Sequence, residues 1–265
     1  MMVDRMEGPF DIQSLGSDIL MKLFREANSL TSGIRIEIVP SGRSDGMGEK
    51  HPAATIGLPL GIPTIQFADS LSRINRIEAV AHELVHLLLL FRYGLGVIGR
   101  KIPRYGNSDD VFRYFMSMGG NWEYLLGQLG NTAHHLILID YLSEEYGIQS
   151  DLHHQLLHHN LQIIANKNWQ DKESLYAKGI IAFEYEKLIG KVDRLIDLDC
   201  QPEFFWKSYH LAQKHFGKYG FQSIPGPSSY EEDILSFLEA LGYRKEDFMF
   251  FSKISMVEDF LSLFS

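Results

Sequence analysis

The chain has 265 residues, a formal net charge of −9 and a pI of about 5.6. This acidic balance argues against general binding to nucleic acid or to an anionic membrane surface. The single cysteine, Cys200, cannot form an internal disulfide, which indicates a reducing compartment. No apolar run reaches the length of a membrane span and no signal-peptide pattern precedes the first helix, so we expect a cytoplasmic protein.

The N-terminal part predicts one helix followed by short strands. Apolar residues recur at helical spacing between residues 11 and 30. Apolar and charged residues alternate from 33 to 40, which is typical of a half-buried strand. Residues 53–58 and 62–67 predict two further strands, and Pro63 would suit a strand at the edge of a sheet.

The next segment, residues 79–91, is an apolar run that contains the pattern H-E-x-x-H. On a helix, His82 and His86 lie one turn apart on the same face, which lets two neutral imidazoles bind one Zn²⁺ ion. Glu83 is then placed to take a proton from a metal-bound water. Burying two imidazoles and a carboxylate on one face without a metal would be costly, so the motif favours a metal site. Ser70 or Ser72 is the expected cap of this helix, which should end near Gly94.

Most of the remaining sequence predicts helices. Residues 94–99 match G-x-G-x-x-G, but they come after a helix rather than a strand, so we interpret them as a flexible loop beside the metal. We expect a short helix at 109–119, a long one from 122 to about 146, and helices near 151–167, 171–190, 202–217, 229–241 and 245–263. The predicted fold class is α+β and mostly helical. A core of residues 1–148 would carry a helical lobe, 149–265, packed on it or merged with it into one domain.

A catalytic zinc usually has three protein ligands, and the third is not adjacent to the motif. The known continuation H-E-x-x-H-x-x-G-x-x-H fails, because Leu89 replaces its glycine and Arg92 replaces its histidine. The third ligand is therefore expected on a later helix.

Within the helix that begins at 122, one face carries Glu123, Gly127, Gly130 and His134. Each glycine costs roughly 1 kcal/mol in a helix interior, which suggests that this face packs tightly against another helix. Glu123 is accordingly the predicted third ligand. His134 and His135 remain alternatives. They lie about 16 Å further along the helix and cannot share an ion with Glu123.

At these residues the sequence resembles a known family. The segment His82-Glu83-Leu84-Val85-His86, followed by a helical glutamate, resembles the gluzincin zinc metallopeptidases, and residues 33–146 are similar to the small cytosolic zincins of the IrrE/ImmA type. The segment Gly120-Asn121-Trp122-Glu123 is similar to the thermolysin-type stretch, although Trp122 separates the asparagine from the glutamate. The resemblance implies a zincin-like sheet before the motif helix, zinc on His82, His86 and Glu123, and Glu83 as the general base.

The substrate implied is a peptide or protein, and His134, His135 and Tyr93 are candidates to contact it or to stabilise the oxyanion. The alternative is a catalytically inactive zincin-like fold that acts as a protein-interaction or regulatory module. A second histidine cluster, with polar flanks, indicates a solvated helix face; its members are His153, His154, His158 and His159.

Overall fold

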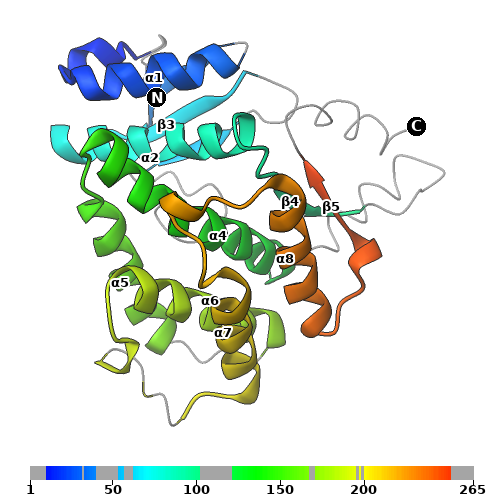
Figure 1. The fold of residues 1–265 in the computed structure, drawn as a ribbon. Helices are drawn as coiled ribbons and strands as arrows, with labels where there is room; N and C mark the ends of the chain where they lie inside the picture. Colours follow the sequence, from blue (N-terminus) through cyan, green and yellow to red (C-terminus); the bar gives the residue numbers. More distant parts are fainter. Residues whose placement is uncertain are drawn as a thin grey trace, which may run out of the picture.

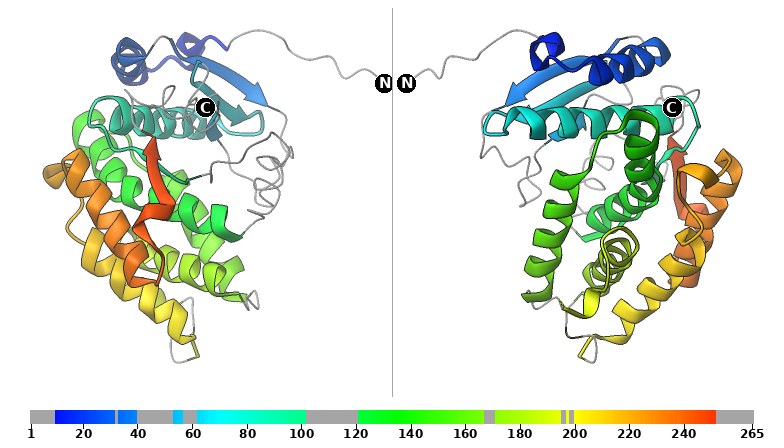
Figure 2. Two further views of the ribbon diagram at one scale, coloured as in Figure 1. Left: turned by 90° about the vertical axis from the view of Figure 1, so that its right-hand side faces the viewer. Right: turned by 60° about the vertical axis from the view of Figure 1, so that its left-hand side comes forward.

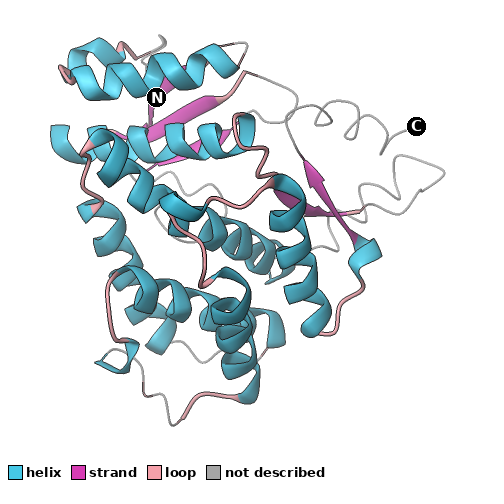
Figure 3. Ribbon diagram, viewed as in Figure 1, coloured by secondary structure: helices cyan, strands magenta, loops and turns pink. Residues whose placement is uncertain are grey.

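A small sheet and a group of packed helices make up the chain, so the fold is α+β and mostly helical, as the sequence predicts (Figure 3). The computed structural model describes residues 10–31, 33–39, 53–56, 62–101, 121–166, 171–194, 197 and 200–251. The predicted helix at 109–119 lies outside these residues. Within them, no helix combines the length and apolar character needed to cross a membrane.

Three strands form a mixed sheet: β1 (Arg35–Val39), β2 (Ala53–Ile56) and β3 (Thr64–Ala68), in the order β1-β3-β2. β1 runs parallel to β3, and β2 runs antiparallel to it with Thr55 opposite Ile65. β2 is therefore an edge strand. The prediction that Pro63 marks an edge strand is wrong, because Pro63 directly precedes the central strand, where its carbonyl accepts a hydrogen bond from the N–H of Arg35 (2.9 Å).

The single helix predicted at 11–30 is divided in two, a 3-10 helix at Ile12–Leu15 and α1 at Asp18–Leu30. Gly16 adopts a left-handed conformation (φ 58°) that ends the first segment, since glycine has no Cβ to oppose it. Ser17 then caps α1 by accepting a hydrogen bond from the N–H of Leu20 (3.2 Å).

The motif helix, α2 (Arg73–Phe91), lies at the centre of the molecule. Ser72 caps its start by accepting a hydrogen bond from the N–H of Asn75, and Gly94 (φ 69°) lies just after its end. Figure 2 shows α2 between the sheet and the helices that come later in the chain. Buried apolar side chains cover almost its whole circumference, which explains the unbroken run of leucines in the sequence.

The later helices begin and end close to their predicted positions: α4 (Asn121–Tyr146), α5 (Asp151–Asn166), α6 (Lys172–Leu188), α7 (Glu203–Phe216) and α8 (Pro227–Ala240). Three short 3-10 helices lie at Val192–Arg194, Phe221–Ser223 and Lys245–Asp247. α4 packs against α2 and α6, and α6 packs against α7 (Figure 1). This packing brings the middle of α4 against the histidine face of α2.

A second, two-stranded sheet was not expected. β4 (Val97–Arg100) pairs antiparallel with β5 (Phe248–Phe251), so that Ile98 lies opposite Phe250. The prediction of a loop at 94–99 is therefore correct for 94–96 but wrong for 97–99, and the prediction of a helix over 245–263 is wrong for 248–251. Aromatic residues such as those of β5 are favoured in strands, but the pairing joins segments that are distant in the sequence and only the tertiary structure brings together.

We predict that Gly179→Ala destabilises the fold. A Cβ at Gly179 would lie 2.1 Å from the Ser208 Oγ and 2.3 Å from the Phe205 carbonyl oxygen, and the carbonyl belongs to the backbone of α7. Overpacking of this kind typically costs about 1–3 kcal/mol of unfolding free energy, which urea denaturation would measure.

Gly127→Ala is the matched control, because no atom of the described residues lies within 4 Å of a Cβ at that position. It should leave the protein as stable as before or raise its stability by up to about 1 kcal/mol. Equal stabilities of the two variants would contradict the packing of α6 on α7.

Candidate metal centre

His82 and His86 project from the same face of α2, as their spacing predicts. The Nε2 atoms of the two rings are 3.2 Å apart, and the ring centroids are separated by 4.9 Å. Two imidazoles one turn apart therefore direct the same nitrogen toward one point.

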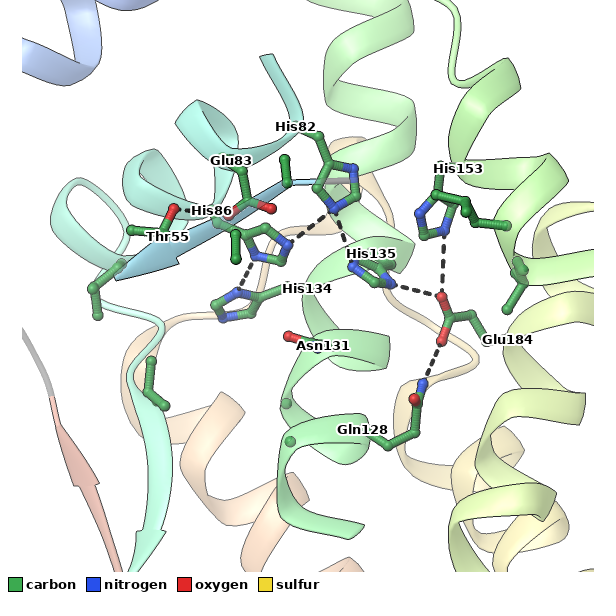
Figure 4. A pocket seen from close by; sticks show the side chains of 18 of the residues that line it. Thr55, His82, Glu83, His86, Gln128, Asn131, His134, His135, His153 and Glu184 are labelled. Atoms are coloured by element: carbon green, nitrogen blue, oxygen red, sulfur yellow. Dashed lines mark hydrogen bonds and ion pairs between the residues drawn. The ribbon is translucent and has the colours of Figure 1, made fainter. Parts of the chain in front are cut away.

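A third ring comes from α4. The Nε2 of His135 lies 3.2 Å from the Nε2 of His82, and ligand atoms of His82, His86 and His135 all lie within 4.8 Å of one another. Figure 4 shows the three rings meeting where α2 crosses α4. These residues form a group that could hold a metal ion.

The spacing of these nitrogens fits a metal ion. Two nitrogens bound to a tetrahedral zinc at about 2.0–2.1 Å are separated by about 3.3–3.4 Å. The distances of 3.2 Å from the Nε2 of His82 to those of His86 and His135 are close to that value. Three imidazole nitrogens are also a donor set that zinc accepts in catalytic sites.

Burial keeps two of the rings neutral. It lowers the pKa values of His82 and His86 well below the ordinary value, and positive charge on neighbouring imidazoles would lower them further. A neutral imidazole retains the lone pair that a metal requires. The electrostatic environment therefore favours the form of His82 and His86 that binds a cation.

Glu184 of α6 orients the third ring. The Nδ1 of His135 is 2.7 Å from the Glu184 Oε1, so the Nδ1–H donates to the carboxylate and, in the neutral ring, Nε2 keeps its lone pair. Metal-binding histidines commonly have such a carboxylate partner. Gln128 and Thr132 donate hydrogen bonds to the other carboxylate oxygen, Oε2.

The Glu184 side chain is 1% exposed. Burial alone would raise the pKa of Glu184, but the charge and hydrogen bonds of His135 and His153 outweigh it and hold the pKa well below its ordinary value. The carboxylate is therefore ionised.

His153 of α5 also belongs to the cluster. Its ring stacks on that of His82 with centroids 5.1 Å apart, and its Nε2 lies 3.4 Å from the Glu184 Oε1. His135, His153 and Glu184 form a second group that could hold a metal ion, and it shares His135 with the first.

The position of His153 depends on Glu78 of α2, whose carboxylate accepts hydrogen bonds from the backbone N–H groups of Leu152 (2.9 Å) and His153 (2.8 Å). An acidic side chain at a helix N-terminus is stabilised by the helix dipole, so Glu78 fixes α5 against α2. The predicted solvated helix face is correct for His159, which is exposed, but wrong for His153, whose side chain is only 12% exposed.

His134, the neighbour of His135 on α4, contacts the cluster from the other side. Its Nδ1 is 3.1 Å from the Nδ1 of His86. Burial and the nearby His135 lower the pKa of His134 to about 4, so this ring is neutral and can accept the Nδ1–H of His86. That hydrogen bond leaves the Nε2 of His86 free to face the other two rings.

Glu83 lies beside the cluster and is held by the edge strand. The Thr55 hydroxyl of β2 donates a hydrogen bond to its carboxylate (2.7 Å). Burial raises the pKa of Glu83 to about 6 against the opposing effect of Thr55. A carboxylate with a pKa close to neutrality can both accept and return a proton.

These residues border a cavity of about 550 Å³. β2 lies on one side, α2 and β4 line another, and α4, α5 and α6 complete the wall. A cavity of this size can take several residues of an extended chain or a small ligand.

Two other residues predicted from the sequence are not part of the described site. The side chain of Glu123 lies outside the described residues, although its backbone belongs to the first turn of α4. Tyr93 is not among the residues that border the cavity; it lies just after α2 and faces Tyr141, with ring centroids 6.3 Å apart. Sequence reasoning missed Glu184 and Thr55. An acid placed directly after the apolar run 179–183 is a signal for Glu184, whereas nothing in the sequence marks Thr55.

Comparison of the chain with protein-family models, curated proteins and solved structures finds no significant match.

We predict that Glu184→Gln lowers the affinity for Zn²⁺ by about 10–100-fold, because the amide keeps the shape but not the charge that orients His135. Competition with a chromogenic chelator would measure the affinity. Glu186→Gln is the matched control on the same helix, since Glu186 accepts from Tyr209 and does not border the cavity. Equal affinities of the two variants would contradict the role of Glu184.

Proposed function

We propose that this protein is a zinc-dependent metallopeptidase in which His82, His86 and His135 hold the metal and Glu83 is the general base. One observation carries the proposal: three imidazole Nε2 atoms converge next to a half-buried carboxylate, in a cavity bordered by an edge strand. Zinc bound there would supply a Lewis acid that polarises the scissile carbonyl and lowers the pKa of a coordinated water.

His135 replaces Glu123 as the third ligand in this proposal. The backbone of Glu123 lies about 18 Å along α4 from that of His135, at a rise of 1.5 Å per residue. In this proposal no glutamate binds the metal directly; Glu184 instead orients the metal ligand His135 by accepting its Nδ1–H. His134 supports His86 in the same way.

The residues of this chain divide the chemistry between them. Glu83 takes the proton of the attacking water and later returns it to the leaving amine, while Thr55 holds the carboxylate in place. Among the described residues, β2 has a strand partner on one side alone, and its outer edge can pair with the main chain of an extended peptide, as edge strands do in many peptide complexes. Because Thr55 belongs to β2, the strand that binds the peptide would also position the base.

We predict that Glu83→Gln lowers turnover of a cleaved peptide by roughly 10²–10⁴-fold, because the amide cannot take a proton. The substrate would be found with a peptide library and the zinc-loaded wild-type protein. Zinc content, measured by elemental analysis, should stay at the wild-type level, since Glu83 is not a ligand. If Glu83→Gln leaves the biological function of the protein unchanged, the result would favour the alternative of a catalytically inactive protein-interaction module.

We predict that zinc stabilises the protein by joining α2 to α4. At a free zinc concentration 100 times its Kd, the gain is about 2.7 kcal/mol of unfolding free energy, and removal by a chelator should reverse it. Thermal melting with and without zinc would measure the shift.

His135→Ala should abolish most of this shift, because it removes the only ligand that α4 contributes to the proposed site. His158→Ala is the control, since His158 contacts Tyr185 and Gln162 and does not border the cavity. An unchanged shift in His135→Ala would contradict the three-histidine site.

A further inference from the structure

Two glycines in the interior of α4 need an explanation, because glycine is among the least favourable residues in a helix interior. The sequence suggests that Gly127 and Gly130 let another helix pack closely, and this prediction is wrong. Among the described residues, a Cβ at Gly127 would meet no atom within 4 Å, and one at Gly130 would meet the Ile98 Cγ2 at 4.0 Å and nothing nearer. By contrast, another helix does pack closely on Gly179 of α6, where a Cβ would lie 2.1 Å from the Ser208 Oγ.

Both glycines border the cavity of the candidate metal centre. Their spacing places them on the same face of α4 as His134, one turn apart from each other and from that histidine. Gly127 and Gly130, here called the glycine face of α4, therefore leave open space on the wall that leads to the metal centre.

Much of the wall of this cavity is apolar. Leu87 and Leu90 of α2, Val97 and Ile98 of β4, and Leu126 of α4 border the same cavity. Val97 is 49% exposed, which leaves it accessible to a ligand. No lysine or arginine is found among the described residues that border the cavity.

The acidic residues of the cavity already have partners. Glu78 accepts backbone N–H groups of α5, Glu83 accepts the Thr55 hydroxyl, and Glu184 accepts the Nδ1–H of His135. A charged ligand side chain would therefore find no free counter-charge among these groups. The charge distribution favours an uncharged, apolar ligand group.

One residue of the cavity wall has a buried hydroxyl for which the described part of the chain offers no hydrogen-bond partner. This residue is Tyr230, whose side chain is 0% exposed. The Tyr230 ring lies beside that of His134, with centroids 5.7 Å apart, and both residues border the cavity. A buried polar group without a partner is costly in a protein, so the Tyr230 hydroxyl indicates a ligand that brings polar main-chain atoms to the wall.

We propose that the glycine face of α4 is the subsite for a large apolar side chain of a peptide substrate, next to the bond that is cleaved. The inference rests on the metallopeptidase function and adds the substrate class to it. The side chain occupies the space above Gly127 and Gly130 against the aliphatic wall. The adjoining main chain meets the Tyr230 hydroxyl.

The test uses three dipeptide hydroxamates whose residue next to the hydroxamate is glycine, leucine or phenylalanine. Their affinities for the zinc-loaded full chain are measured by calorimetry. The wild-type protein should bind the leucyl and phenylalanyl compounds at least about 10-fold more tightly than the glycyl compound, as is usual for an apolar pocket.

In Gly130→Leu, this ratio should fall to about one, because the new side chain fills the subsite. Binding of the glycyl compound should be retained. Ser143→Leu is the matched control, because it introduces the same residue at an exposed position of α4 outside the cavity. It should keep the wild-type ratio.

Gly127→Leu and Gly130→Ala provide an independent check if Gly130→Leu does not fold. Gly130→Ala should raise the melting temperature, because alanine favours the helix. It should also lower the affinity for the phenylalanyl compound more than the affinities for the other two. A purely structural role of Gly130 would instead lower the melting temperature without changing the preference.

Two results would overturn the subsite alone. In one, the wild-type protein binds the three compounds with equal affinity; in the other, Gly130→Leu and Gly127→Leu keep the wild-type preference. Absence of hydroxamate binding by the zinc-loaded wild-type protein would overturn the metal-centred function, and the subsite with it.

Discussion

The contact between His82 and His135 is the interaction on which the arrangement of this protein depends. Two buried ring nitrogens at 3.2 Å cannot both carry a proton toward each other, so they must share either a proton or a cation. Glu184 decides the state of one ring by accepting its other N–H. One constraint therefore links three features of the structure. They are the crossing of α2 and α4, the burial of Glu184 in α6, and the lone pair that the Nε2 of His135 directs toward His82.

A buried carboxylate is tolerated only where donors surround it. Glu184 meets this condition through Gln128, Thr132 and His135, all from α4. The same requirement couples α6 to α4, so neither helix can shift without exposing or unpairing the charge. Glu78 couples α5 to α2 in a similar way, because its carboxylate caps the helix that carries His153. Polar contacts between helices thus hold the candidate centre rigid.

The cavity has two different walls on either side of the histidines. Within the part of the chain that the structure describes, β2 offers a strand edge without a partner, whereas the glycine face of α4 offers open space beside apolar residues. A strand edge recognises main chain and an open apolar pocket recognises side chains, so the two walls together suit an extended peptide. In the proposed function, Thr55 links the peptide-binding strand to the general base, since it belongs to β2 and also donates a hydrogen bond to Glu83.

The sequence by itself determined the features that depend on local periodicity. The H-E-x-x-H spacing placed His82 and His86 on one face of a helix, and apolar patterns located most of the helices and the three-stranded sheet. The tertiary structure alone decided which groups meet across elements: His135 with His82, Glu184 with His135, Thr55 with Glu83, and β4 with β5. Those contacts join segments far apart in the chain, and a pattern that repeats every two or four residues carries no information about them.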